Sequence, residues 1–492
     1  MSNRGVIGDA SGARRPRGGT VLISSAAGTG RTQDADVVVV GAGVSGLAAA
    51  HHLARAGVRV LVLEAEDRTG GRMATDGVDG YRLDRGGQLL CPDWPELARL
   101  PALAPLALRP FAPGALLRAG ERTYRVGDLR HPGLPGRPAG GGRAPVPGQA
   151  ARGERVQRGF GAARAQATAR TRWAMTGALD VVRLRTALTR FAATSPQRLL
   201  SRPELPAGQA LSARGHSVHM VEPLIRPLLA ALLSDPGLTT SSRIADVTLR
   251  GFVRAGLCLP AGGLDAVPRL LAGALPEGTV RTGVRVTAVT TNSVTTEEHG
   301  VLSCRAVVIA TGARAAAGLL PGLRVPDFHP VTVLHHAADE PPLLSPALVV
   351  EGGTRRGPVS HTWVASAVDP TRSRPGLPLV TSVVLGAAAG DPPSVLDKAA
   401  RAQLGALYGA SAERWSLLSA TRDDCAVPAM PAPHDVRRPV RVLSGLYVCG
   451  DHRDTSTAQG ALTSARRAAQ EVLRDFGLPL PTPGGRAERA AA

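Results

Sequence analysis

Three glycines and an acid near the start of the chain have the types and the spacing to hold a phosphorylated cofactor. Gly41, Gly43 and Gly46 form a G-x-G-x-x-G pattern, and Glu64 follows 23 residues after the first glycine. These glycines allow a tight turn, a close approach of the backbone to a pyrophosphate and close packing of a helix on a strand. The first amides of that helix, including that of Ser45, would face the phosphates, and Glu64 would accept hydrogen bonds from a ribose. The pattern predicts a site for FAD or NAD.

The neighbouring segments supply the elements that this chemistry needs. Residues 36–40 predict a fully buried strand, residues 45–56 a helix and residues 58–63 a second strand. Glu64 therefore stands at the end of the second strand, where an acid disfavours a ribose 2′-phosphate. Together the segments predict the βαβ start of a dinucleotide-binding fold.

Three later motifs decide between the two cofactors. They are Arg68-Thr-Gly70-Gly71-Arg72, Asp84-Arg-Gly86-Gly87-Gln88, and Gly450-Asp451 followed by Gly460-Ala461 at the start of a helix. With the first pattern they resemble the superfamily of flavin amine oxidases, protoporphyrinogen oxidases and phytoene desaturases, and most closely its phytoene dehydrogenase-like members. The resemblance implies an FAD-dependent oxidoreductase, a dehydrogenase or oxidase, that binds FAD without a covalent bond.

The resemblance also implies what each motif contacts. The segment from Arg68 to Arg72, with its two glycines, would lie along the pyrophosphate and the ribityl chain. Gly86 and Gly87 would let the planar flavin ring lie against bare backbone. Gln88 would then stand near the reactive edge of the flavin.

Two further segments complete the predicted site. Asp451 would accept hydrogen bonds from cofactor hydroxyls, and the helix that opens at Gly460 and Ala461 would point its N-terminus at the flavin. By the same resemblance, Val286 lies in a strand whose backbone contacts the adenine. Cys449 lies inside a strand, so we expect it to be buried rather than bonded to the flavin.

The motifs divide the chain into interleaved parts of an α/β fold. We expect a Rossmann-like FAD-binding domain of the glutathione-reductase type and a discontinuous α+β substrate domain. The FAD-binding domain is predicted over residues 34–105, 255–325 and 440–478. The substrate domain is predicted over residues 106–254 and 326–439, with disordered tails at 1–33 and 479–492.

Much of the formal net charge of +19 lies in two segments without periodic patterning. Residues 1–33 and 131–175 carry +11 of it and are rich in Gly, Ala, Pro and Arg. That composition predicts disorder rather than a nucleic-acid partner. For residues 131–175 a shifted reading frame is the alternative to a disordered insertion, because the composition changes abruptly at both ends.

Cysteine spacing and hydropathy favour a cytoplasmic protein. The five cysteines are never closer than 24 residues apart, so neither a CxxC metal site nor a dithiol pair is predicted. No apolar run reaches the roughly 18 residues of a membrane span. The apolar residues 220–233 predict a buried helix, with contact with a membrane surface as the alternative. Nothing in the sequence indicates an oligomeric state.

Two departures from the amine-oxidising members of the superfamily bear on the substrate. Those members place a lysine beside the flavin, whereas Lys398 is the only lysine here and lies far from every cofactor motif. They also carry an aromatic residue before the last helix, and residues 452–459 contain none. We therefore expect a small apolar substrate that loses hydride to FAD, with oxygen, a quinone or another acceptor. An amine or amino-acid oxidase, a redox-silent FAD-binding carrier and a flavin-dependent isomerase stay open.

No side chain has a strong claim to catalysis. Gln88 is the one candidate, because it follows the glycines that would lie against the flavin. His335 and His336 end a strand of the predicted substrate domain, where an imidazole could exchange protons. Strand alternation predicts that one of the two faces outward.

Overall fold

The computed structural model describes residues 35–119, 122–129, 184–214, 221–353 and 357–480 of the 492-residue chain. The predicted N-terminal tail, the segment 131–175 and residues 481–492 of the predicted C-terminal tail lie outside the described residues.

The predicted strand–helix–strand start forms the centre of a six-stranded sheet. β1 (Val37–Val40) pairs in parallel with β2 (Val60–Leu63) and with β13 (Ala306–Ile309). The parallel strands β9 (Val280–Arg281) and β20 (Leu446–Val448) extend the sheet on either side, and the antiparallel β19 (Arg441–Leu443) ends it.

Both faces of this sheet are covered, which explains the four consecutive valines of β1. On one face, Val37 and Val39 belong to a core with α1 (Val44–Arg55) and α13 (Ala458–Asp475). On the other, Val38 and Val40 pack with an antiparallel three-stranded sheet. Its strands are β10 (Val286–Val289), β11 (Ser293–Thr296) and β12 (Gly300–Ser303). Alternate residues of a strand face opposite sides, so two buried faces require an unbroken apolar run.

A larger sheet has seven strands in the order β18-β14-β17-β16-β15-β6-β7. Its strands are β6 (Ala115–Ala119), β7 (Arg122–Val126), β14 (Phe328–Ala337), β15 (Leu348–Glu351), β16 (Val359–Val364), β17 (Leu379–Leu385) and β18 (Ser416–Pro428). All neighbours are antiparallel except β6 and β15. On one face α12 (Pro393–Tyr408) buries Leu396 and Leu404 against Val380 and Val384.

Helices from the middle of the chain cover the other face of the larger sheet. They are α4 (Pro196–Leu200), α5 (Ala207–Ala213), a π-helical turn (Val221–Ile225), α7 (Arg226–Leu233) and α8 (Ser242–Ala255). Leu228 and Leu249 join Val333 and Val383 in one core. The apolar side chains of α7 are thus packed inside the protein, as expected for a helix of the substrate domain.

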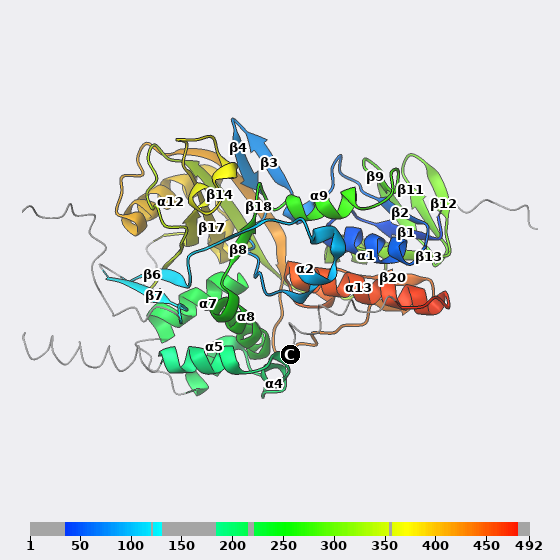
Figure 1. Ribbon diagram of the computed structural model, residues 1–492, viewed down its shortest axis with the longest axis horizontal. Coiled ribbons are helices and arrows are strands. Elements are labelled where there is room, and N and C mark those ends of the chain that lie inside the picture. The colour runs from blue at the N-terminus through cyan, green and yellow to red at the C-terminus, as the bar shows by residue number, and fades with distance from the viewer. Residues whose placement is uncertain (1–34, 120–121, 130–183, 215–220, 354–356, 481–492) are drawn as a thin grey trace, which may run out of the picture.

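Short elements connect the two sheets. β3 (Thr75–Val78) and β4 (Tyr81–Asp84) form a hairpin, and β5 (Leu108–Pro110) pairs with β8 (Cys258–Pro260). Further short helices are α2 (Pro95–Arg99), α9 (Ala266–Gly273), α10 (Ala313–Leu319) and α11 (Ala365–Val368). In Figure 1 the β3–β4 hairpin stands between the larger sheet and the six-stranded sheet.

The arrangement confirms the predicted α/β fold with a Rossmann-like sheet. Figure 1 shows the six-stranded sheet with α1 and α13 on one side of the molecule and the larger sheet with α12 on the other. The strands of the six-stranded sheet come from the three predicted FAD-binding segments, and those of the larger sheet from the two predicted substrate segments. The domain boundaries themselves stay predictions. No helix among the described residues is long and apolar enough to cross a membrane.

Candidate active site

A cavity of about 900 Å³ opens at the carboxyl ends of β1, β2, β13 and β20. Parallel α/β sheets bind ligands at this edge, and the volume is in the range of small-molecule and cofactor sites. Most residues of the predicted site line its wall. They are Gly41, Gly43, Ser45, Glu64, Gly70, Gly71, Arg72, Gly86, Gly87, Gln88, Val286, Gly450, Asp451 and Ala461.

Three predicted cofactor-binding residues, Gly46, Arg68 and Gly460, do not line the cavity. A Cβ atom on Gly46 would lie 1.9 Å from the carbonyl oxygen of Gly41, so this glycine lets α1 approach the turn after β1. Gly460 plays the same part at the start of α13, where a Cβ atom would lie 1.9 Å from the carbonyl oxygen of Thr455. Arg68 forms an ion pair of 2.6 Å with Asp76 on β3.

The turn between β1 and α1 offers bare backbone to the cavity. A Cβ atom on Gly43 would meet nothing within 4 Å, although neighbouring Gly41 is tightly packed against Ala310. No side chain caps α1, so its first amides are free to bind an anion, which the helix dipole favours. The turn therefore fits a pyrophosphate.

Glu64 is held at the end of β2 in one orientation. Its Oε2 accepts a hydrogen bond from the amide of Ala42 at 2.7 Å, and its Oε1 accepts one from the amide of Glu66 at 2.9 Å. A carboxylate oxygen accepts more than one bond, so Glu64 can still accept from ribose hydroxyls in the cavity.

Arg72 and Asp451 meet on the cavity wall. Their side chains form an ion pair, and the Arg72 guanidinium also donates to the carbonyl oxygen of Ala426 at 2.6 Å. The negative charge of Asp451 raises the pKa of Arg72, although partial desolvation of the guanidinium by the cavity wall opposes this. Burial opposes ionisation of Asp451, but the charge and hydrogen bonds of Arg72 outweigh it and hold the pKa of Asp451 below its usual range. Both side chains are therefore charged.

The Gly86–Gly87 segment lies between the cavity and the larger sheet. A Cβ atom on Gly87 would lie 2.9 Å from Val383 on β17 and 3.3 Å from Val333 on β14. A Cβ atom on Gly86 would lie 2.7 Å from the carbonyl oxygen of Arg72. No larger residue fits at either position without a shift of its neighbours.

Both ends of the Gln88 amide have protein partners. Its Nε2 donates to the carbonyl oxygen of Ser456 at 3.0 Å, and its Oε1 accepts from the amide of Ala458 at 3.1 Å. Gln88 therefore fastens the segment after Gly87 to the start of α13. Its catalytic role stays a prediction, and this geometry favours a positioning role.

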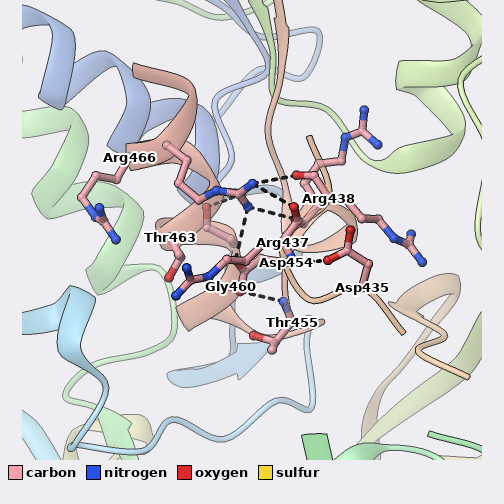
Figure 2. A network of polar contacts seen from close by, with 12 residues as sticks. Asp435, Arg437, Arg438, Asp454, Thr455, Gly460, Thr463 and Arg466 are labelled. Atoms are coloured by element: carbon pink, nitrogen blue, oxygen red, sulfur yellow. Dashed lines mark hydrogen bonds and ion pairs between the residues drawn. The ribbon is translucent and has the colours of Figure 1, made fainter. Parts of the chain in front are cut away.

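A polar network fixes the loop that follows Asp451 (Figure 2). Arg467 of α13 donates to the carbonyl oxygens of Arg437 at 3.2 Å and Arg438 at 2.8 Å, and it lies 3.5 Å from the carboxylate of Asp454. Burial raises the pKa of Asp454 to about 6, against the opposing effects of the Thr455 amide and Arg467. The network ties α13 to the segment before β19.

The expectation that His335 or His336 faces outward was wrong. Both are buried, because the hairpin strand β4 and helix α12 lie against opposite faces of β14. His335 Nε2 lies 2.9 Å from the carbonyl oxygen of Asp84, and His336 Nε2 lies 3.2 Å from the carboxylate of Asp397 on α12. Neither histidine lines the cavity. Cys449 is fully buried, as expected.

Sequence reasoning missed the wall that the larger sheet contributes. β14 supplies Phe328 and Val331, and the end of β18 supplies Ala426, Val427 and Pro428. The segment that forms β18 has no clear alternation of polar and apolar residues. Its long pairing with β14 is a tertiary contact, so the strand can be recognised only from the structure. The strand predicted to end at His335 and His336 is β14.

The residues that fit a dinucleotide cofactor agree with comparisons of the chain to known proteins. A family model described as "Flavin containing amine oxidoreductase" matches residues 44–473. The chain is 32% identical over 297 residues to phytoene dehydrogenase of Streptomyces griseus, which is 56% of this chain and 53% of that protein. It is 47% identical over 97 residues to putrescine oxidase of Kocuria rosea, which is 20% of this chain and 19% of that protein. The chain thus matches only part of the length of these curated relatives.

Solved structures share the fold over almost their whole length. A protoporphyrinogen oxidase candidate from Exiguobacterium sp. 255-15 superposes with a TM-score of 0.63 and 17% identity, over 90% of this chain and 98% of that one.

Proposed function

The chain belongs to the flavin-containing amine oxidoreductase family, and on that premise we propose that it is an FAD-dependent oxidoreductase that removes hydride from an apolar substrate. When bound, FAD would supply the group that accepts the hydride, and the final electron acceptor would be oxygen, a quinone or another acceptor. The substrate would be of the desaturase or porphyrinogen-oxidase kind, a polyene or a polycyclic compound.

The residues of the cavity fit FAD. Glu64 would hold the ribose, the free amides at the start of α1 would hold the pyrophosphate, and Arg72 and Asp451 would hold the chain that follows. Gly86 and Gly87 would leave room for a planar ring next to the larger sheet. Because Cys449, next to Gly450 and Asp451, is fully buried and does not line the cavity, we propose that FAD is held without a covalent bond. Cys425 is the described cysteine that does line it.

The observation that carries the substrate proposal is the character of the wall next to these glycines. Phe328 and Val331 on β14 and Val427 and Pro428 at the end of β18 give it apolar surface, although Arg422 and Asp423 on β18 also line the cavity. Apolar surface favours a substrate without charge, because a buried unpaired charge is costly. Among the described residues lining the cavity there is no lysine, and Lys398 is exposed on α12.

One observation favours an amine as the second candidate. Asp423 on β18 lines the same cavity, and a carboxylate there could pair with a protonated amine. Putrescine oxidase is also among the similar proteins. Asp423 Oδ1 is already bonded to the amide of Cys425 at 2.7 Å, which leaves its other oxygen for a ligand.

Anaerobic mixing of the FAD-loaded protein with trial substrates separates the candidates. We expect a polyene or a porphyrinogen to bleach the oxidised flavin, and putrescine and cyclohexylamine to leave it unchanged. Bleaching by the amines alone would overturn the proposal in favour of an amine oxidase. A flavin that dithionite reduces but no substrate bleaches would favour a redox-silent carrier or an isomerase. Peroxide formed in air would identify oxygen as the acceptor.

The variant Asp423→Asn sharpens this test. Asparagine keeps an acceptor for the Cys425 amide and removes the charge. Hydride loss from an apolar substrate should be little changed, whereas amine oxidation should weaken by about tenfold or more, because the substrate cation loses its partner.

A further inference from the structure

A buried ion network lies behind the cavity wall that Gly86 and Gly87 form. Its centre is Arg372, in the 3-10 turn Pro370–Arg372 between β16 and β17. The side chain of Arg372 is 2% exposed, and those of its two acidic partners, Asp84 and Asp369, are 6% and 0% exposed. None of the three lines the cavity. Buried charges of this kind are stable only when paired.

Asp84 connects Arg372 to two parts of the wall. Its Oδ2 accepts from Arg372 Nη1, while its Oδ1 accepts from Thr75 Oγ1 at 2.7 Å and from the amide of Leu264 at 2.9 Å. Leu264 lines the cavity, and Asp84 comes two residues before Gly86. The carboxylate of Asp84 therefore fixes both Leu264 and the start of the Gly86–Gly87 segment.

Asp369 connects the same arginine to the turn after β8. Its Oδ2 lies 3.5 Å from Arg372 Nε and accepts from the amide of Gly262 at 2.7 Å. Arg372 Nη2 also donates to the carbonyl oxygen of Pro260 at 3.2 Å. Gly262 has a φ of +81° and Gly263 a φ of +134°, so this turn adopts backbone conformations that other residues rarely take.

The backbone of Asp84 is held as well as its side chain. The ring of His335, on β14, bridges the carbonyl oxygen of Asp84 at 2.9 Å and the hydroxyl of Thr381 on β17 at 3.1 Å. Burial lowers the pKa of His335, so the ring is neutral, donates through one nitrogen and accepts through the other. The larger sheet thus holds the backbone of Asp84 through His335, in addition to the contacts of the Asp84 carboxylate.

We propose that Arg372 is a positioning residue that sets the place of the Gly86–Gly87 segment and Leu264 against the bound flavin. It joins three segments that are far apart in the sequence, at Asp84, Pro260–Gly262 and Asp369. Without its charge, the buried carboxylate of Asp84 would lose its cationic partner and that of Asp369 would keep only Arg109, at 3.8 Å, so the segments would move apart or take up water. This proposal rests on FAD binding and is independent of the substrate.

The test compares Arg372→Met with a control at a second ion pair, in which the acid Asp246 is buried and both Arg202 and Arg214 bind it. Arg214 binds both oxygens of Asp246, at 2.7 and 2.8 Å, among the helices away from the FAD cavity, and the control is Arg214→Met. FAD affinity is measured by titrating the full-length apoprotein with FAD and following flavin fluorescence. The circular dichroism of the flavin in the visible range then reports its surroundings, and thermal unfolding of the apoprotein reports stability.

We expect Arg372→Met to weaken FAD binding by about tenfold or more and to change the visible circular dichroism. Arg214→Met should lower stability and leave both flavin readouts as in the parent. Arg372→Lys keeps the charge and should restore part of the affinity. If Arg372→Met does not fold, the same two readouts on Arg372→Lys decide, with a weaker affinity and an altered spectrum expected.

Two results would overturn the proposal. One is a folded Arg372 variant with an FAD dissociation constant within about twofold of the parent and an unchanged spectrum. The other is an equal loss of FAD affinity in Arg214→Met, which would show that any loss of stability weakens FAD binding.

Discussion

Arg72 and Asp451 lie 379 residues apart in the sequence and form a two-bond ion pair on the cavity wall, with nitrogen–oxygen distances of 2.7 and 2.8 Å. The pair joins the motif that follows β2 to the motif that follows β20. Because the Asp451 side chain is 9% exposed and that of Arg72 is 42% exposed, the arginine is the partner that faces open space in the cavity.

This pair should contribute to FAD affinity. Asp451→Asn removes the negative charge that orients Arg72, so we expect FAD binding to weaken by about tenfold or more. The matched control is Arg401→Gln, at the partly exposed two-bond pair of Arg401 and Asp397 on α12. Titration of each apoprotein with FAD gives the comparison. Equal affinity in Asp451→Asn and the parent would remove this pair from the cofactor site.

Gly43 and Gly46 should respond differently to the same change. Gly46→Ala places a methyl group against the carbonyl oxygen of Gly41, and we expect it to destabilise the apoprotein by about 1–3 kcal/mol or more. Gly43→Ala meets no protein atom, so the apoprotein should keep its stability while FAD binding weakens. Denaturant unfolding and FAD titration of both variants check this. A stable Gly43→Ala protein with full FAD affinity would contradict the placement of the pyrophosphate.

The contrast between these sites shows how far the sequence predicts the molecule. The turn after β1 and Glu64 are specified within some 25 residues, where hydrophobic pattern, glycine spacing and an acid all point to one fold. Asp84 and Arg372 are 288 residues apart, and no local pattern marks Arg372 as the partner of a buried acid. The β18 wall was missed for the same reason, because its pairing with β14 is a tertiary contact.

Gln88 should act on cofactor binding rather than on proton transfer. Gln88→Leu removes both bonds to the Ser456–Ala458 segment, so we expect weaker FAD binding and a less stable holoenzyme. Flavin reduction at saturating FAD should fall by a smaller factor. The measurement is anaerobic reduction at several FAD concentrations. If the reduction rate collapses while FAD affinity is unchanged, Gln88 is catalytic after all.

Buried histidines should make the fold sensitive to acid. Desolvation lowers the pKa of the buried His336 and His452, and of the half-buried His52, to about 4 from 6.5. Between these values the unfolded chain binds more protons than the folded one, so stability falls as the pH falls from about 6.5 to about 4. Asp454 acts in the opposite direction, because its pKa is raised from 3.8 to about 6.

We therefore expect the thermal midpoint of the apoprotein to fall from about pH 7 to about pH 4.5, since three histidines outweigh one carboxyl group. Asp454→Asn removes the opposing group, so its midpoint should rise at about pH 7 and should fall more steeply toward acid. Thermal unfolding of both proteins across this range is the check. A midpoint that is flat or rises toward acid would show that the histidines are not buried in neutral form.

The visible absorption spectrum of the purified protein, titrated with FAD, tests the central claim most directly. We predict saturable binding of one FAD per chain, with the bound flavin released into the supernatant when the protein is denatured. A protein that is folded but takes up no FAD would contradict the account. Flavin that stays with the denatured chain would contradict the non-covalent part of it and would point to Cys425, the cysteine on the described cavity wall.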